Sequence, residues 1–199
     1  MSRLDDLANN YEKHISAPWQ RNLADAQRSI FVVYPQEDER RIRAKIGDFE
    51  VRTCNAGHDW QLVDLTDKFP QWTASEEYRE IYFEDPLDLK LKLDTDFMDF
   101  VSRNIRGVLI NEKATEQSVV AVVGGASLYG FLHISELIDK VAGDIRGRLV
   151  FFFLGHFEQG TYRLLGAKSG WNYLATPITH RSVRSTAIRQ PIALPDSVA

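Results

Sequence analysis

Four short apolar runs recur along the chain, and each has the length and composition of a buried β-strand. β-branched and aromatic residues dominate these runs, and such residues fit the pleated surface of a sheet. The last run is apolar on both faces, which is typical of a strand in a sheet covered by helices on both sides. The four runs are SIFVVY (29–34), WQLVDL (60–65), SVVAVV (118–123) and RLVFFFL (148–154).

Between these runs, apolar residues recur at the three- and four-residue spacing of amphipathic helices. Two further segments, 161–165 and 171–176, follow turns that contain glycine, and we expect them to be short edge strands. An acidic stretch in the middle of the chain is expected to hold one or two helices, broken near Pro86. The other predicted helices lie over about 3–14, within 36–56, through 97–105 and over 128–141.

The alternation of strands and helices indicates βαβ units joined by right-handed crossovers. We therefore expect an α/β fold with a mostly parallel sheet of about four to six strands flanked by helices. This fold would be Rossmann-like, or a degenerate P-loop-like fold without a phosphate loop. We interpret residues 1–179 as a single α/β domain, in which 1–28 form an N-terminal helix and connection, and 180–199 as a C-terminal tail.

Length and composition narrow the class of protein. A chain of 199 residues can bury a core without the help of disulfides or metals. Cys54 is the only cysteine, which favours a reducing compartment, and we interpret it as a small buried hydrophobe rather than a reactive thiol. The first residues lack the apolar core of a signal peptide, and no run approaches the length of a membrane span. We expect a cytoplasmic protein without membrane contact.

Charge is unevenly distributed along the chain, whose net charge is −4. Residues 75–99 hold nine acidic and three basic residues, a net charge of −6, so the rest of the chain carries +2. The last twenty residues contain three arginines and a single aspartate. These two segments are either separate contact surfaces or a solvated helix face and a disordered end. In the acidic segment, the candidate partner contacts are Glu76, Glu77 and Glu80.

In an open α/β sheet, ligands bind beyond the carboxyl ends of the strands. The sequence PQEDERR follows the first strand, which places acidic residues where a phosphate would be repelled, and the chain contains neither GxxxxGK[ST] nor GxGxxG. Ordinary ATP or dinucleotide binding is therefore not expected, and we predict no cofactor. The segment Gly124-Gly125-Ala126-Ser127 follows the third strand. We favour a tight turn there, with Ser127 helping to cap the next helix, over a ligand site.

Several polar and aromatic residues follow the third and fourth strands. His133 and Glu136 lie three residues apart on the predicted helix and would share one face, and His156 follows the fourth strand. If the sheet is parallel, the two histidines could approach one another and form a metal or acid–base site. The chain has no HExxH motif and no Cys–His cluster, which favours polar edge residues instead. The candidate partner contacts near these strand ends are Ser127, Tyr129, His133, Glu136 and His156.

The order of these motifs resembles the BrxB family of bacterial BREX phage-exclusion systems. The resemblance rests on VVGGASLYGFLHISELIDKV, followed by RLVFFFLGHF, TYRLL and WNYLATPI. The earlier segments SIFVVYPQEDERRIR and AGHDWQLVDLT resemble the opening strand, helix and second strand of that family. The resemblance spans about residues 25–178, which is most of the chain.

The resemblance implies a small accessory protein of an antiviral defence system, encoded beside a methyltransferase, a phosphatase-like PglZ protein and a large AAA+ ATPase. No catalytic activity is assigned to the family. We therefore expect a non-catalytic adaptor that binds another BREX protein, with the PglZ-like protein as the leading candidate. Two alternatives remain open. One is a degenerate nucleotide-fold enzyme that uses His133, Glu136 and His156, and the other is a subunit that contacts nucleic acid weakly through the arginine-bearing tail.

Overall fold

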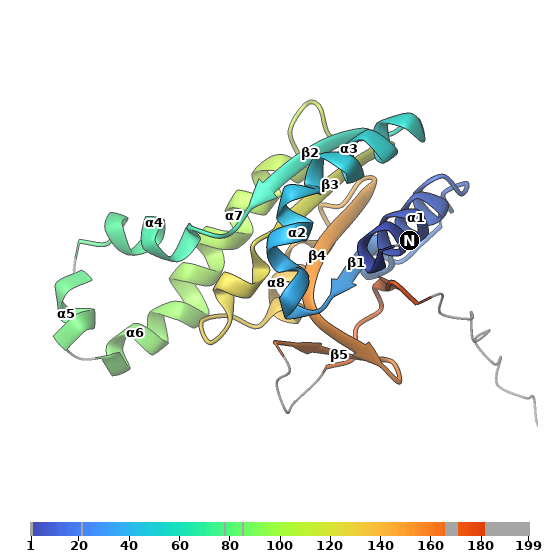
Figure 1. Cartoon of the computed structure of the whole chain (residues 1–199). Helices are drawn as coiled ribbons and strands as arrows, with labels where there is room; N and C mark the ends of the chain where they lie inside the picture. The colour runs from blue at the N-terminus through green and yellow to red at the C-terminus, as the bar shows by residue number, and fades with distance from the viewer. Residues whose placement is uncertain (1, 21, 78, 85, 166–170, 182–199) are drawn as a thin grey trace, which may run out of the picture.

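Figure 1 shows the computed structural model of the chain, an α/β fold built on one mostly parallel sheet of six strands. The structure describes residues 2–20, 22–77, 79–84, 86–165 and 171–181. Five strands run in parallel, and β5 pairs with β4 in the antiparallel direction. The predicted α/β fold class is confirmed. The strands are β1 (Ser29–Tyr34), β2 (Asp59–Asp64), β3 (Ser118–Val123), β4 (Arg148–Glu158), β5 (Thr161–Leu164) and β6 (Thr176–Ile178).

The strand order is β2-β3-β4-β1-β6, so the first strand of the chain lies near the middle of the sheet. β1 and β4 pair over their apolar runs, and Tyr34 lies opposite Leu154 at their carboxyl ends. β2 and β3 end at the same edge, where Asp64 lies opposite Val123. The carboxyl ends of four strands therefore meet at one edge of the sheet, as parallel pairing requires.

Helices cover both faces of the sheet, which explains why its central strands are apolar on both sides. One face packs against α1 (Arg3–Ile15), α2 (Glu39–Ala44) and α3 (Ile46–Asn55). The other packs against α7 (Met98–Leu109) and α8 (Ile134–Ala142). Among the described residues, no helix combines the length and the apolar character that crossing a membrane requires.

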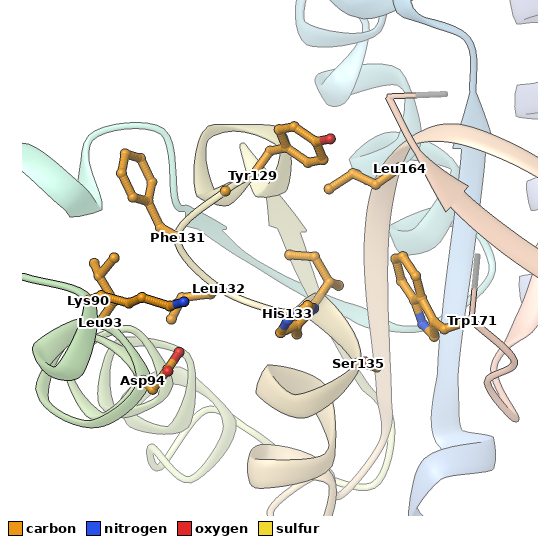
Figure 2. A pocket seen from close by; sticks show the side chains of 12 residues that line it. Lys90, Leu93, Asp94, Tyr129, Phe131, Leu132, His133, Ser135, Leu164 and Trp171 are labelled. Carbon is orange, nitrogen blue, oxygen red and sulfur yellow. The ribbon is translucent and has the colours of Figure 1, made fainter. Parts of the chain in front are cut away.

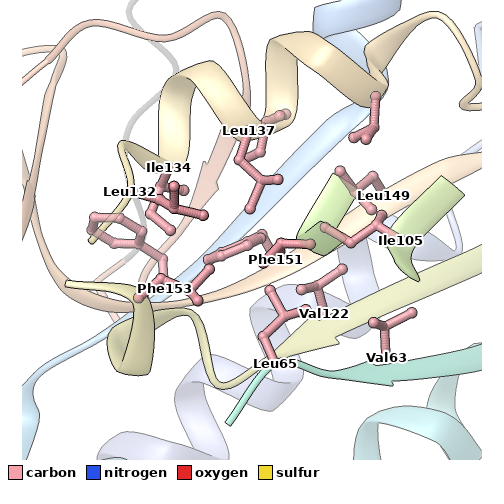
Figure 3. Packing of buried hydrophobic residues seen from close by; sticks show 14 of the residues in the cluster. Val63, Leu65, Ile105, Val122, Leu132, Ile134, Leu137, Leu149, Phe151 and Phe153 are labelled. Atoms are coloured by element: carbon pink, nitrogen blue, oxygen red, sulfur yellow. The ribbon is translucent and has the colours of Figure 1, made fainter. Parts of the chain in front are cut away.

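The two faces sort the phenylalanines of β4 into separate cores. Phe151 and Phe153 pack on the α7–α8 face, and Figure 3 shows them beside Leu137 of α8. Phe152 packs on the opposite face, where its ring meets the edge of the Phe49 ring at a centroid distance of 5.0 Å. Successive residues of a strand point to opposite faces, so three consecutive aromatic residues serve both cores.

A helical lobe extends from the sheet between β2 and α7 (Figure 1). Aromatic rings hold it together: Trp72 of α4 lies 5.1 Å from the Phe97 ring and 6.4 Å from the Tyr82 ring. The lobe contains most of the acidic segment, and α6 begins at Pro86, where the sequence predicted a break. Its elements are α4 (Lys68–Ser75), α5 (Arg79–Glu84), α6 (Pro86–Lys92) and the π-helical turn η3 (Leu93–Phe97).

Three expectations from the sequence are wrong in detail. The helix predicted over 128–141 begins only at Ile134, because Gly130 adopts a left-handed φ of 83° that interrupts the helical path. Cys54 is exposed rather than buried, since its neighbour Thr53 occupies the inward position of α3. The segment 171–176 forms a single bridge at Trp171 with Tyr162, and the strand β6 begins at its last residue.

Candidate functional site

At the carboxyl edge of the sheet, a network of side chains joins the segment after β1, where a phosphate loop would lie in a nucleotide-binding fold, to the end of β2. The Arg43 guanidinium donates to Glu39 at 2.7 Å and to the Thr66 hydroxyl at 2.7 Å. It also forms an ion pair with Asp64 at 3.4 Å. The Tyr34 hydroxyl donates to Glu39 at 2.7 Å. Of the acidic residues that follow β1, Glu39 thus pairs with Arg43, whereas Glu37 and Asp38 pair with Arg3 of α1.

Ionisation states in this network follow from its contacts. Partial burial acts to raise the pKa of Asp64, but the hydrogen bonds from Thr66 and the nearby Arg43 charge outweigh it, so the pKa lies below its ordinary value. Burial, together with the hydrogen bond to Glu39, raises the pKa of Tyr34 above its ordinary value. Tyr34 therefore stays protonated and keeps donating its hydrogen bond.

Gly124 lies where the end of β3 meets the loop after β2. Its φ of 79° is left-handed, and a Cβ atom built on it would lie 2.6 Å from the Thr66 backbone nitrogen and 2.8 Å from an Asp64 carboxylate oxygen. The end of β3 is therefore pressed against the loop after β2. The Gly124-Gly125 turn packs against protein at this point, as the tight-turn interpretation predicted.

A pocket of about 630 Å³ opens farther along the same edge, on the α7–α8 face (Figure 2). The loop 129–135 forms one wall, α6 and η3 form a second, and β5 with Trp171 forms a third. The lining is mainly apolar and aromatic, as in most pockets that bind a ligand or an anchoring side chain. Its aromatic and charged members are Tyr129, Phe131, Trp171, Lys90, Asp94 and His133.

Packing behind the pocket fixes two of its walls. The Phe131 ring stacks on Phe69 of α4 at a centroid distance of 4.1 Å. The Trp171 ring meets the edge of Phe153 at 5.4 Å, and its backbone exchanges two hydrogen bonds with Tyr162. Tyr162 is fully buried and donates from its hydroxyl to the Ala175 carbonyl at 2.8 Å. These contacts hold Phe131 and Trp171 of the lining in place.

Two polar features remain available at the pocket. The indole Nε1 of Trp171 is buried and has no hydrogen-bond partner among the described residues. Tyr129 stands at the pocket with 51% of its surface exposed. An unpaired buried donor is costly, so an acceptor that approached Nε1 would relieve that cost.

The structure brings together some of the residues that the sequence singled out and separates others. Tyr129 and His133 both line the pocket. Ser127 lies in the short turn η4 (Gly125–Leu128) and does not cap α8, whose N-cap is His133 without a side-chain cap bond. Glu136 is exposed in the first turn of α8 and does not line the pocket. His156 is exposed on β4 and lies toward Glu37, in the turn that follows β1.

His133 and His156 therefore lie on different faces of the sheet. Phe157, the neighbour of His156, packs with the core of the α7–α8 face, and strand alternation turns His156 to the other face. Across the described residues, no group of three or more His, Cys, Asp or Glu side chains is placed to hold a metal ion. The approach of the two histidines, which the sequence left open as an alternative, does not occur in the fold.

The three candidate glutamates lie in the lobe, at the junction of α4 and α5. Glu76 is the C-cap residue of α4, and α5 begins at Arg79, so the three do not share one continuous helix face. Glu77 and Glu80 are exposed, and Glu76 is half-buried. The same lobe supplies Lys90 and Asp94 to the pocket wall.

Among the apolar members of the pocket that sequence reasoning missed are Leu93, Leu164 and Trp171. They lie in segments far apart in the chain, and nothing in the sequence distinguishes them from other apolar residues of a helix or strand. The one available signal in the sequence was the tryptophan placed directly after Gly170. The chain matches no family model, and no curated protein or solved structure shows significant similarity to it.

Proposed function

We propose that this chain is a non-catalytic accessory protein of a BREX-type phage-defence system, which works in the cytoplasm by binding another protein of that system. The PglZ-like protein is the proposed partner. The resemblance of the ordered sequence motifs supports the choice of system. The pocket at the carboxyl edge of the sheet supports protein binding as the mode of action.

The observation that carries the proposal is the aromatic and apolar lining of this pocket beside a half-exposed tyrosine. Tyrosine and tryptophan are enriched among the residues that dominate protein–protein binding energies. The pocket holds one lysine, one aspartate and one histidine among mainly apolar side chains, a composition suited to an inserted side chain of a partner. Because Phe131 and Trp171 are already held by neighbouring rings, little ordering is needed on binding.

Charge around the pocket indicates what the partner should carry. The pocket wall formed by α6 and η3 lies within the segment of net charge −6. A partner with an apolar anchor flanked by lysine or arginine would be attracted to it, and charge complementarity of this kind mainly accelerates encounter. Asp94 of η3 is the acidic residue that lines the pocket itself.

The arrangement of polar candidates supports binding over catalysis. A general base must lie within hydrogen-bond reach of the group it serves, and a catalytic pair must converge on one place. His133, Glu136 and His156 lie in three different settings, and only His133 lines the pocket. The Tyr34–Glu39–Arg43 network is already satisfied by its own contacts.

The proposal is tested by measuring the affinity of the purified chain for the PglZ-like protein. Tyr129→Ala should weaken binding at least about tenfold, the equivalent of roughly 1.4 kcal/mol. The matched control is Val51→Ala, since Val51 is 57% exposed on α3, on the opposite face of the sheet. Absence of binding by the wild-type chain would reject the partner, and equal affinity of the two variants would reject the pocket.

A further inference from the structure

A second pocket, of about 480 Å³, lies at the opposite edge of the sheet, where β2, β3 and β4 begin. Arg148 is the first residue of β4 and pairs with Val119 in β3, which places it at this amino edge. The protein-binding pocket lies at the carboxyl edge, so the two sites are separate. The side chains used below are Trp19, Arg28, His58, Glu116, Arg146 and Arg148, and we call this site the arginine pocket.

The three guanidinium groups of the arginine pocket are held by main-chain carbonyls. Arg28 donates to the carbonyl of residue 145 at 2.7 Å, and Arg146 donates to that of residue 114 at 3.0 Å. Arg148 donates to the carbonyls of residues 147 and 20, at 3.0 and 3.2 Å. A guanidinium has five N–H donors. Most donors of these groups therefore have no partner within the part of the chain that the structure describes.

Negative charge near these arginines is sparse. Arg28 forms an ion pair with Asp25 at 3.8 Å, and Asp25 is largely exposed. Within the described part of the chain, neither Arg146 nor Arg148 forms an ion pair with a carboxylate. Glu116 lines the pocket but makes no ion pair there either. The lining therefore has an excess of two positive charges.

Arg148 is the unusual member, because it is only 8% exposed. Its guanidinium lies over the Trp19 ring, 4.6 Å from the centroid. Burial, together with the charge of Arg28, lowers the pKa of Arg148 below its ordinary value, and the Arg148 charge adds to burial in lowering the pKa of His14. A buried charge without a counter-charge destabilises the fold, and an anion bound beside it would remove that cost.

The aromatic wall holds Arg148 in position. Trp19 and His58 stack at a centroid distance of 3.8 Å, and both rings are within hydrogen-bond distance of the Ile15 carbonyl. A carbonyl oxygen only accepts, so Nε2 of His58 carries the proton that it donates. Nδ1 of His58 is then an acceptor; it is buried and has no hydrogen-bond partner among the described residues. The pocket therefore combines a fixed guanidinium with a second polar group that lacks a partner.

We propose that the arginine pocket binds the phosphate group of a small molecule. A phosphate dianion matches the excess charge of the lining, and guanidinium groups bind phosphate oxygens through paired N–H donors. Three arginines from two separate parts of the chain, already fixed by carbonyls and by Trp19, form a site that needs little rearrangement. Free phosphate and a phosphate monoester share the chemistry that this site recognises.

Calorimetric titrations at constant ionic strength test this proposal with three probes: inorganic phosphate, glycerol 3-phosphate, and a short single-stranded oligonucleotide without terminal phosphates. Either or both of the first two should bind, and the stronger binder identifies the source of the phosphate. Saturating ligand should also raise the melting temperature. Binding of the oligonucleotide alone would overturn the proposal in favour of nucleic-acid contact. Probe concentrations of about 10 mM detect even weak affinity, so the absence of binding by all three probes at that concentration would reject the site.

Arg146→Ala is the informative variant, because Arg146 is exposed and its removal leaves the core intact. It should weaken phosphate binding at least about tenfold, whereas Arg146→Lys, which keeps the charge, should lose less. Arg103→Ala is the matched control: Arg103 is an exposed arginine of α7 that also donates to a main-chain carbonyl. Arg148→Gln should abolish binding if it folds. Equal phosphate affinity in Arg146→Ala and Arg103→Ala would overturn the proposal, whatever the partner assay shows.

Discussion

Replacing Phe152 by alanine tests the layered architecture of the sheet. The Phe152 side chain is 1% exposed, lies opposite Val32 in the β1–β4 pairing and meets the edge of the Phe49 ring. Truncation of a buried phenylalanine costs about 3–5 kcal/mol, and the cost is greatest where the surroundings cannot collapse. β4 is paired on both sides by β1 and β3, so the backbone is held in place. We therefore expect the upper half of that range.

The loss in free energy of unfolding is measured by urea titration, with far-UV circular dichroism as the signal. For a chain of this size, each kcal/mol shifts the melting temperature by roughly 2–4 °C, so the predicted fall is about 8–20 °C. Phe152→Leu, which keeps most of the volume, should cost less than about 1.5 kcal/mol and provides a measurable variant if the alanine chain does not fold. Val51→Ala on the exposed side of α3 should stay within about 0.5 kcal/mol. A loss below about 1.5 kcal/mol for Phe152→Ala would refute the proposed packing.

Three further predictions follow from other contacts. Reversing the three glutamates at the α4–α5 junction to lysine should slow association with the PglZ-like protein and flatten its salt dependence in stopped-flow measurements, without changing the melting temperature; a chain truncated after Thr179 should associate at the wild-type rate. Gly125→Ala should lower stability by about 1–3 kcal/mol in urea titrations, because the new Cβ would lie 2.4 Å from the Phe151 ring. Burial lowers the pKa of His14 below 6.5, so the unfolded chain binds the proton more tightly and stability falls as the pH drops from about 7 to 5; His14→Gln should reduce that fall.

The sheet was largely predictable because its strands carry their signal locally. Runs such as SVVAVV are apolar at every position, and β3 coincides with that run. The length of β4 was less predictable, since it continues to Glu158 past its apolar part. Gly155 permits this extension: a Cβ there would lie 2.0 Å from the Arg163 backbone oxygen of β5. That requirement depends on the partner strand and is not visible in the run itself.

The sites were less predictable because they depend on contacts between distant segments. Tyr129 and His133 were found from their place after β3, but Trp171 reaches the same pocket from beyond β5. No local sequence motif indicates the arginine pocket, since nothing in the segments around Arg28 and Arg148 distinguishes them from other arginines of the chain. Thr53, rather than Cys54, faces inward because its hydroxyl meets that of the buried Tyr11 at 2.5 Å. The apolar spacing in the sequence leaves the phase of this helix uncertain by one residue, so it cannot decide whether Thr53 or Cys54 faces inward.

Hydrogen–deuterium exchange of the chain, alone and in complex with the PglZ-like protein, tests the central claim most directly. The pocket loop 129–135 and the wall formed by α6 and η3 should become protected when the partner binds, because their exposed backbone would be covered. The α3 face around Val51 serves as the internal reference and should exchange at the same rate in both samples. Protection of the loop with an unchanged reference is the predicted result. Stable complex formation without any protection of that loop would contradict the assignment of the pocket.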